Sequence, residues 1–345
     1  MPNSPQPTTV SDAQIKDASD ILAKNGVVAM PTETVYGLAA RIDSDQGIKK
    51  IFEIKQRPFF DPLIVHVSSI KQAEDCALEW NELNQKLAEL FWPGPLTLVV
   101  PKNEKISDLI TSGLTTVGLR WPKHSVACRL IEAAGVPLAA PSANKFGKTS
   151  PTQASHVTDE FGAAVLVLNG DASEIGIEST VLSVKKSEKK YELAILRKGA
   201  LLQSQITQAL ATFGFDYSWV EITDKKESPG HMKHHYMPSV PLVICKNPQM
   251  KFEELTRLLN EKIKELPDEV EGVRMVKPKG VIKKIEILRL SNQPEQAARE
   301  LYSQLRSVSQ RSPDALCFIQ SSAQTGEMWE SIFDRLYKAA SLILD

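Results

Sequence analysis

The chain has 345 residues, of which 42% are hydrophobic and 24% charged, and its formal net charge is −1. This length predicts about two domains, and the balanced charge excludes a global basic excess that would hold the chain on nucleic acid or a membrane. Four widely spaced cysteines without a CxxC pair argue against a zinc ribbon or disulfide framework, and a polar N-terminus without an apolar core argues against a signal peptide. We therefore expect a cytoplasmic protein without a membrane span.

The first 212 residues alternate helical and strand patterns. The segment 11–26 carries apolar residues on one helical face, with Ser11 as a plausible N-cap, and 68–78, 81–91 and 125–135 have similar patterns. Short valine-rich runs predict strands at 27–30, 63–67, 96–100, 116–120, 137–140, 164–169, 180–184 and 192–197. Because strands outnumber helices, we expect residues 1–212 to form an α/β domain with a large, twisted, mixed sheet.

The pattern changes after residue 212. The segment 213–240 has weak periodicity, several prolines and histidine-rich turns, which predicts a linker. The remaining residues, 241–345, alternate strand-like runs with helical segments and predict a small parallel α/β domain. The runs are 241–245, 272–276, 286–290 and 315–320, and the helical segments are 250–265, 293–308 and 326–343.

Two cations, Lys55 and Arg57, directly precede the predicted strand 63–67. Pro58 disfavours a helical conformation at Arg57, so the preceding helix should end there. Cations at a helix C-terminus are favoured by the helix dipole alone. Alternatively, the pair clamps a polyanion such as a triphosphate, with a planar fork and a mobile point charge. His66, inside the strand, is more often a satisfied core residue.

Polar side chains gather where the predicted strand 27–30 ends. Thr32, Glu33, Thr34 and Tyr36 follow it within six residues. In α/β sheets, ligands bind where strands end. The alternative is a helix start capped by Thr32.

A second polar cluster, 140–152, follows the predicted strand 137–140 and is dense in small hydroxyl and amide residues. Ser142 and Asn144 would point from the sheet edge. Backbone N–H groups and such side chains can surround phosphate or ribose. A flexible surface loop is the alternative.

Other patterns are less informative. Arg120 and Arg197 end predicted strands, where an arginine is usually solvated. The run HMKHH (231–235) has a superficial metal-binding look but no partner cluster in the sequence, so we expect no metal site. The chain contains neither a P-loop motif nor a nucleophile elbow.

Taken together, PTETVYGLAA, KQRPFFDPL, APSAN, SPT and GIESTVL, in this order, resemble the threonylcarbamoyl-AMP synthase family, also called YrdC-like. The later SPGHMKHHYMP and SIFDRLYKAA resemble its two-domain members, so the resemblance covers nearly the whole chain. It implies a YrdC-like open, twisted, mixed sheet with helices and a concave, positively lined surface, followed by a smaller Rossmann-like parallel α/β domain. It also implies a reaction in which L-threonine, bicarbonate and ATP give threonylcarbamoyl-adenylate and pyrophosphate. The product would pass to a separate transferase that modifies tRNA.

The resemblance also implies roles for single residues. Lys55 and Arg57 would bind the ATP phosphates and act in catalysis. The other nucleotide-side positions are Asn144, Ser150, Arg197 and, as a lid residue of the linker 213–240, Tyr236. The threonine-side positions are Thr32, Tyr36, His66, Arg120, Ser142 and Ser179. Mg²⁺ would accompany ATP, with no tightly bound cofactor.

Two other functions compete with this interpretation. An RNA-binding module could use a basic concave surface, although the chain has near-zero net charge and no stacking-aromatic motif. A YrdC-like domain of hydrogenase maturation is a third possibility, but the cysteine-rich zinc motifs and acylphosphatase segment that we associate with those proteins do not occur in this sequence.

Overall fold

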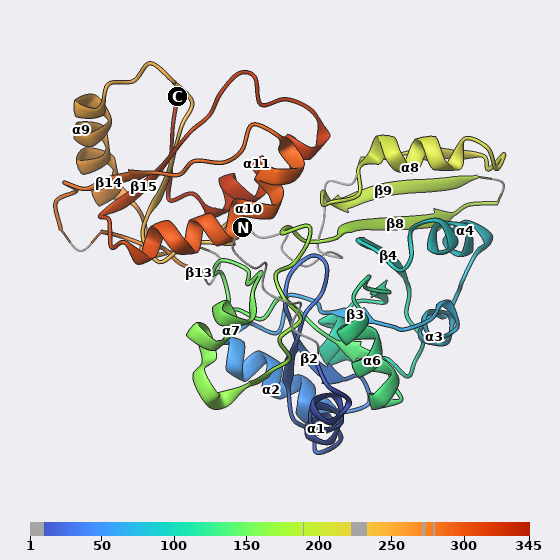
Figure 1. Cartoon of the computed structure of the whole chain (residues 1–345). Coiled ribbons are helices and arrows are strands. Elements are labelled where there is room, and N and C mark those ends of the chain that lie inside the picture. Colours follow the sequence, from blue (N-terminus) through green and yellow to red (C-terminus); the bar gives the residue numbers. More distant parts are fainter. Residues whose placement is uncertain (1–9, 189, 222–232, 271–272, 279) are drawn as a thin grey trace, which may run out of the picture. The chain divides into compact units, whose positions relative to one another are not determined.

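The computed structural model describes residues 10–188, 190–221, 233–270, 273–278 and 280–345 (Figure 1). The chain divides into two compact units. The N-terminal unit comprises residues 1–144 and 151–231, and the C-terminal unit comprises 145–150 and 232–345. The short segment 145–150 therefore belongs to the C-terminal unit, although the chain on either side of it lies in the N-terminal unit.

A ten-stranded mixed sheet forms the centre of the N-terminal unit, with the strand order β10-β9-β8-β4-β5-β3-β6-β2-β1-β7. Its strands are β1 (Val28–Met30), β2 (Gly37–Arg41), β3 (Ile64–His66), β4 (Leu96–Pro101), β5 (Thr116–Arg120), β6 (Leu138–Ala139), β7 (Leu166–Val167), β8 (Thr180–Lys186), β9 (Tyr191–Arg197) and β10 (Tyr217–Trp219). Pairs such as β3–β5 and β4–β8 are parallel, whereas β4–β5 and β8–β9 are antiparallel. The predicted large mixed sheet is confirmed.

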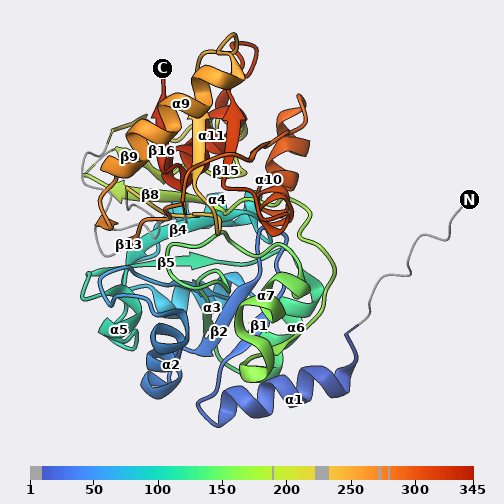
Figure 2. The same cartoon turned by 90° about the vertical axis from the view of Figure 1, so that its left-hand side faces the viewer.

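Helices cover both faces of this sheet where β1 and β2 lie. The helices of this unit are α1 (Asp12–Ala23), α2 (Asp45–Lys55), α3 (Ile70–Cys76), α4 (Glu82–Phe91), α5 (Asp108–Thr111), α6 (Ser125–Ala134), α7 (Ala154–Phe161) and α8 (Gln203–Leu210). Alternate residues of β1 point to opposite faces, so Val28 packs with α1 and α6 while Ala29 joins the cluster that contains α2 (Figures 1 and 2). As predicted, Ser11 caps α1, in a capping box with Gln14.

The C-terminal unit contains a four-stranded, all-parallel sheet with the order β14-β15-β11-β16. The strands are β11 (Leu242–Cys245), β14 (Ile285–Ile287), β15 (Ala315–Ile319) and β16 (Leu342–Leu344), and the helices are α9 (Phe252–Lys262), α10 (Pro294–Gln310) and α11 (Glu327–Ala339). Leu255 and Leu259 of α9 pack on Val243 and Cys317 of the sheet. This arrangement confirms the small parallel α/β domain.

The structure corrects three predicted elements. The helix predicted for 326–343 ends at Ala339, because the apolar residues 342–344 pair with β11 as strand β16. Within the predicted linker, β10 pairs in parallel with β9, while residues 222–232 of the linker lie outside the described residues. The run 272–276 contributes β13 (Val273–Arg274), which pairs with β12 (Glu269–Val270) instead of joining the parallel sheet.

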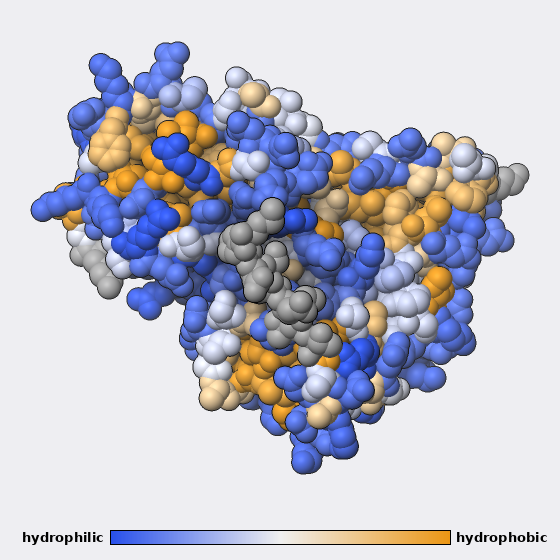
Figure 3. Space-filling model, in the orientation of Figure 1, coloured by the Kyte–Doolittle hydropathy of each residue, from blue (hydrophilic) through white to orange (hydrophobic). Residues whose placement is uncertain are grey.

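The surface carries scattered apolar side chains. Figure 3 shows apolar surface near α9 and β15 and along β8 and β9. Phe252 of α9 is 51% exposed, and Phe59 and Phe60, in the loop after α2, are each 53% exposed. Over the described ranges, no helix has both the length and the apolar character that a membrane crossing requires.

Replacing Leu22 by Ala should lower the free energy of unfolding of the N-terminal unit by about 2–5 kcal/mol, because this fully buried side chain joins α1 to the sheet. Urea unfolding measures the change. The matched control is Leu78→Ala, since Leu78 is 69% exposed and its truncation should cost less than about 0.5 kcal/mol. Equal losses for the two variants would contradict the packing assigned to α1.

Candidate active site

Lys55 is the last residue of α2 and is almost completely buried, at 1% exposure. Its Nζ donates hydrogen bonds to the backbone carbonyls of Ser142 and Asn144, each at 2.5 Å. Burial, and secondarily the charge of Arg57, holds the pKa of Lys55 well below its ordinary value. The helix ends as predicted, because Gln56 adopts a left-handed conformation with φ of 52°. Lys55 thus connects α2 to the loop after β6.

Arg57 holds the loop that follows α2 in one shape. Its Nε and Nη2 donate to the carbonyl of Asp61 at 3.2 and 3.0 Å, and Nη2 also donates to the carbonyl of Pro62 at 2.9 Å. The guanidinium forms an ion pair of 2.9 Å with the carboxylate of Asp61, and both side chains are buried. Phe59 stacks on Phe52 of α2 with ring centroids 4.5 Å apart. The two cations therefore fix backbone around the site.

Thr32 stabilises a tight turn between β1 and β2. Its Oγ1 donates to the carbonyl of Val35 at 2.6 Å, accepts from the N–H of Val35 at 3.2 Å and lies 2.9 Å from Oγ1 of Thr34. Strand β2 begins at Gly37, so the alternative that Thr32 caps a helix is wrong. The polar cluster lies at the end of a strand.

Tyr36 is fully buried and joins two other segments of the unit. Its hydroxyl donates to the carbonyl of Asp171 at 2.6 Å and accepts from the N–H of Gly170 at 3.2 Å. Its backbone N–H donates to the carbonyl of Pro151 at 2.8 Å. Burial raises the pKa of Tyr36 to about 12, so the hydroxyl stays protonated at neutral pH.

Arg120, at the end of β5, is buried and has a counter-ion that sequence reasoning missed. Its Nη2 lies 2.7 Å from Oε1 of Glu33, and Glu33 is 2% exposed. Its Nη1 donates to Oγ1 of Thr34 at 2.9 Å, and its Nε donates to the carbonyl of Gly94 at 3.2 Å. The expectation of a solvated strand-terminal arginine is therefore wrong here. An acidic residue inside an otherwise neutral turn was the available signal for a buried charge partner.

His66 lies beside Arg120, because β3 and β5 pair in parallel with these two residues in register. Burial, followed by the charge of Arg120, lowers the pKa of His66 to about 3. The imidazole is therefore neutral at physiological pH. Within the described part of the chain, its Nδ1 has no hydrogen-bond partner.

Ser179 and Arg197 are in direct contact, although the family resemblance places them on different substrates. Arg197 donates to the carbonyl of Ser179 from Nε and Nη2 at 3.2 and 3.0 Å, and to its Oγ from Nη2 at 3.1 Å. Oγ of Ser179 also lies 2.8 Å from Oγ1 of Thr97 on β4. A Cβ at Gly199 would lie 2.4 Å from the backbone of Ser179 and Thr180, so only glycine permits this approach.

The remaining predicted site residues divide between the two units. Ser142 pairs with Gly37 as an isolated bridge, and Asn144 is 1% exposed in the same loop of the N-terminal unit. Ser150 and Tyr236 belong to the C-terminal unit and are also buried. The run 231–235 is described only from residue 233 onward, so its first two residues lie outside the described residues.

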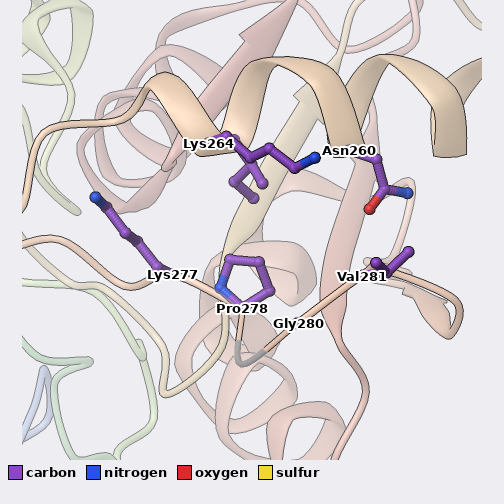
Figure 4. Close-up of a pocket in the computed structure, with 7 residues that line it drawn as sticks. Asn260, Lys264, Lys277, Pro278, Gly280 and Val281 are labelled. Atoms are coloured by element: carbon purple, nitrogen blue, oxygen red, sulfur yellow. The ribbon is translucent and has the colours of Figure 1, made fainter.

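The C-terminal unit has a pocket of about 440 Å³ away from all these residues in the chain. Figure 4 shows Asn260 and Lys264, from α9 and the turn that extends it, facing Pro278 and Val281. The carboxamide of Asn260 is bonded to the backbone of Ile282, and Lys277 pairs with Asp268 at 2.7 Å. No residue with a predicted catalytic or binding role lines this pocket.

The low pKa of His66 gives a pH dependence of stability. Its folded-state pKa of about 3 lies below the ordinary value of 6.5, so the unfolded chain binds the proton more readily and stability falls as pH drops below about 6.5. Between about pH 6 and pH 4, wild type should lose up to about 1.4 kcal/mol per pH unit more than His66→Gln. Urea unfolding at several pH values tests this expectation, which parallel pH profiles would contradict.

Both units of the chain are similar to known proteins of one family. The Sua5/YciO/YrdC family model, described as telomere recombination, matches residues 20–199, and the model of the threonylcarbamoyl-AMP synthase C-terminal domain matches 201–341. The threonylcarbamoyl-AMP synthase of Pyrococcus abyssi is 34% identical over 333 residues, covering 96% of this chain and 95% of that protein. The Bacillus subtilis synthase is 36% identical over 337 residues, covering 96% and 94%.

A solved structure shares the fold of the whole chain. The crystal structure of P. abyssi Sua5 complexed with L-threonine superposes with a TM-score of 0.78 at 32% sequence identity, covering 98% of this chain and 97% of that one. The similarity thus includes the mixed sheet, the parallel sheet and the segments that carry the buried cations. The chain belongs to the threonylcarbamoyl-AMP synthase family of enzymes.

Proposed function

We propose that this enzyme is a nucleotidyltransferase that converts L-threonine, bicarbonate and ATP into threonylcarbamoyl-adenylate and pyrophosphate. The observation that carries the proposal is a set of four buried cations in the N-terminal unit. Lys55, Arg57, Arg120 and Arg197 are each at most 8% exposed, and Lys55 and Arg57 lie in the family motif KQRPFFDPL. Cations held in a low-dielectric interior suit small anionic substrates.

Arg120 is suited to bind the carboxylate of threonine. A guanidinium has five N–H donors; Nη1 and Nε use one each for Thr34 and Gly94, and Nη2 forms an ion pair with Glu33. Each of its two terminal nitrogens therefore keeps a donor for a substrate carboxylate. The relative crystallised with L-threonine supports an amino-acid site of this kind.

Lys55 is suited to bind a phosphate of ATP. Its ammonium has three donors, and the carbonyls of Ser142 and Asn144 take two of them. The third can bind a phosphate oxygen. A nearby phosphate would also raise the depressed pKa of Lys55 by stabilising its charged form.

The proposed reaction requires positioning and charge neutralisation. The amine of threonine first bonds to the carbon of bicarbonate with loss of water, which gives N-carboxylated threonine. A carboxylate oxygen of this group then forms a bond to the α-phosphorus, while the bond from the α-phosphorus to the α,β-bridging oxygen breaks and pyrophosphate leaves with the electron pair. No covalent enzyme intermediate is needed, so fixed cations can supply most of the stabilisation. Mg²⁺ would accompany ATP and share the phosphate charge. The product would pass to a separate tRNA-modifying transferase, and the lid role of Tyr236 rests on the family resemblance.

The alternative of an RNA-binding module gains no support from these cations. Non-specific contacts to RNA phosphates need exposed lysines and arginines. Here the four cations are buried and bonded to the chain's own backbone and carboxylates.

Pyrophosphate release in the presence of ATP, bicarbonate and Mg²⁺ should depend on L-threonine. Lys55→Ala should reduce the rate on the order of 100-fold, because it removes a cation from the phosphates and a support from the loop. Lys50→Ala is the matched control, since Lys50 lies on the same helix and is exposed. Threonine-independent release, or equal rates for the two variants, would overturn the proposal.

Arg120→Lys should raise KM for threonine about 10- to 100-fold, because a point charge cannot keep the contacts to Glu33 and Thr34 and also bind a carboxylate. Steady-state kinetics with each substrate varied in turn measure the effect. KM for ATP should stay near the wild-type value. A rise in KM for ATP alone would place Arg120 on the nucleotide side.

A further inference from the structure

The segment 145–150 is bound within the C-terminal unit by backbone hydrogen bonds. The N–H of Thr149 donates to the carbonyl of Met237 at 3.1 Å, and the N–H of Met237 donates to the carbonyl of Gly147 at 2.8 Å. Oγ1 of Thr149 donates to the carbonyl of Tyr236 at 3.1 Å. Residues 147–149 thus run beside residues 236–237 like a short piece of parallel sheet.

Side-chain packing holds the same segment. Phe146 packs against the cluster of Met237, Val273 and Met275. Gly147 has a φ of 72°, and a Cβ there would lie 2.8 Å from Cγ1 of Val273. A residue other than glycine would therefore be strained and would clash at this position.

Arg306 of α10 adds a charged donor to these contacts. Its Nη2 donates to the carbonyl of Thr149, and Thr149 is 3% exposed. A charge-assisted hydrogen bond to a buried carbonyl is stronger than a neutral one. Arg306 thus binds the C-terminal part of the segment to a long helix of the C-terminal unit.

The residues directly before and after the segment are hydrogen-bonded to candidate site residues. The carbonyl of Asn144 accepts a hydrogen bond from Lys55, and the carbonyl of Pro151 accepts one from the backbone of Tyr36. Only six residues separate these two fixed points. A short segment held at both ends and in the middle has few alternative conformations.

We propose that Arg306 is a positioning residue for nucleotide binding. By holding Thr149, it fixes the conformation of 145–150 and hence the backbone at Asn144 and Ser150, which the family resemblance places on the nucleotide side. The C-terminal unit thereby acts on the reaction through the continuity of the chain. This inference rests on the proposed function only for its link to ATP.

Steady-state kinetics of the full chain test the role of Arg306. Arg306→Ala should raise KM for ATP about tenfold with KM for threonine nearly unchanged, because the lost hydrogen bond loosens the nucleotide-side loop. Arg306→Lys should recover part of the loss, since an ammonium can donate to the same carbonyl. The matched control, Arg311→Ala, removes an arginine with a 60% exposed side chain just after the same helix and should behave like wild type.

Thr149→Val provides a second variant that removes a different bond to the same segment. Its effect on KM for ATP should be less than additive with Arg306→Ala, because both changes release one loop. Wild-type KM for ATP in Arg306→Ala would overturn the proposal. So would an equal rise in both KM values accompanied by a lower melting temperature, which indicates general destabilisation.

Amide hydrogen exchange without substrates separates this proposal from the proposed reaction. The amide of Thr149 should exchange about tenfold faster in Arg306→Ala than in wild type or Arg311→Ala. Unchanged exchange would refute the positioning role even if the enzyme makes the adenylate. If the amide of Thr149 exchanges faster in Arg306→Ala but the wild-type enzyme shows no threonine-dependent pyrophosphate release, the role of Arg306 in holding the segment 145–150 stands. The proposed reaction is then refuted.

Discussion

The arrangement of the candidate site depends on the hydrogen bonds of the buried Lys55 amine. Lys55 is the last residue of α2, and its amine donates to two backbone carbonyls of the loop after β6. Taking a lysine out of water is unfavourable, as the lowered pKa of Lys55 shows. The two short hydrogen bonds offset part of that cost, and they place the loop against the helix. Without the lysine, the two carbonyls would lose a buried hydrogen-bond donor, and if the loop moved away, the buried amine would lose its acceptors.

The other buried cations follow the same principle. Arg57 binds the loop after α2, Arg120 binds the turn before β2, and Arg197 binds the backbone beside β8. Each side chain is thus oriented by the protein before a substrate arrives. Pre-oriented charges need little reorganisation during a reaction, which is the property that phosphoryl chemistry requires of a binding site. The cations therefore stabilise the loops and, under the proposed function, also present fixed charges to the substrates.

Sequence patterns predicted the parts of the fold that local residues decide. Strand β5 has the predicted bounds, because TVGLR is β-branched and apolar between turn residues. Strand β2 was missed, since GLAAR is rich in small residues and alanine favours helices. The pairing of Glu33 with Arg120, and the contact between Ser179 and Arg197, join residues far apart in the chain. No local pattern specifies such partners, so only the folded sheet reveals them.

The sheet of the N-terminal unit has a consequence for behaviour at high concentration. Its outermost strands, β7 and β10, have only two and three residues. An edge strand exposes unpaired N–H and C=O groups that can pair with another molecule, and the risk grows with its length. Ten strands thus lie side by side while the backbone available for edge-to-edge association stays short. Because its two edge strands are short, this wide sheet is protected from edge-to-edge aggregation.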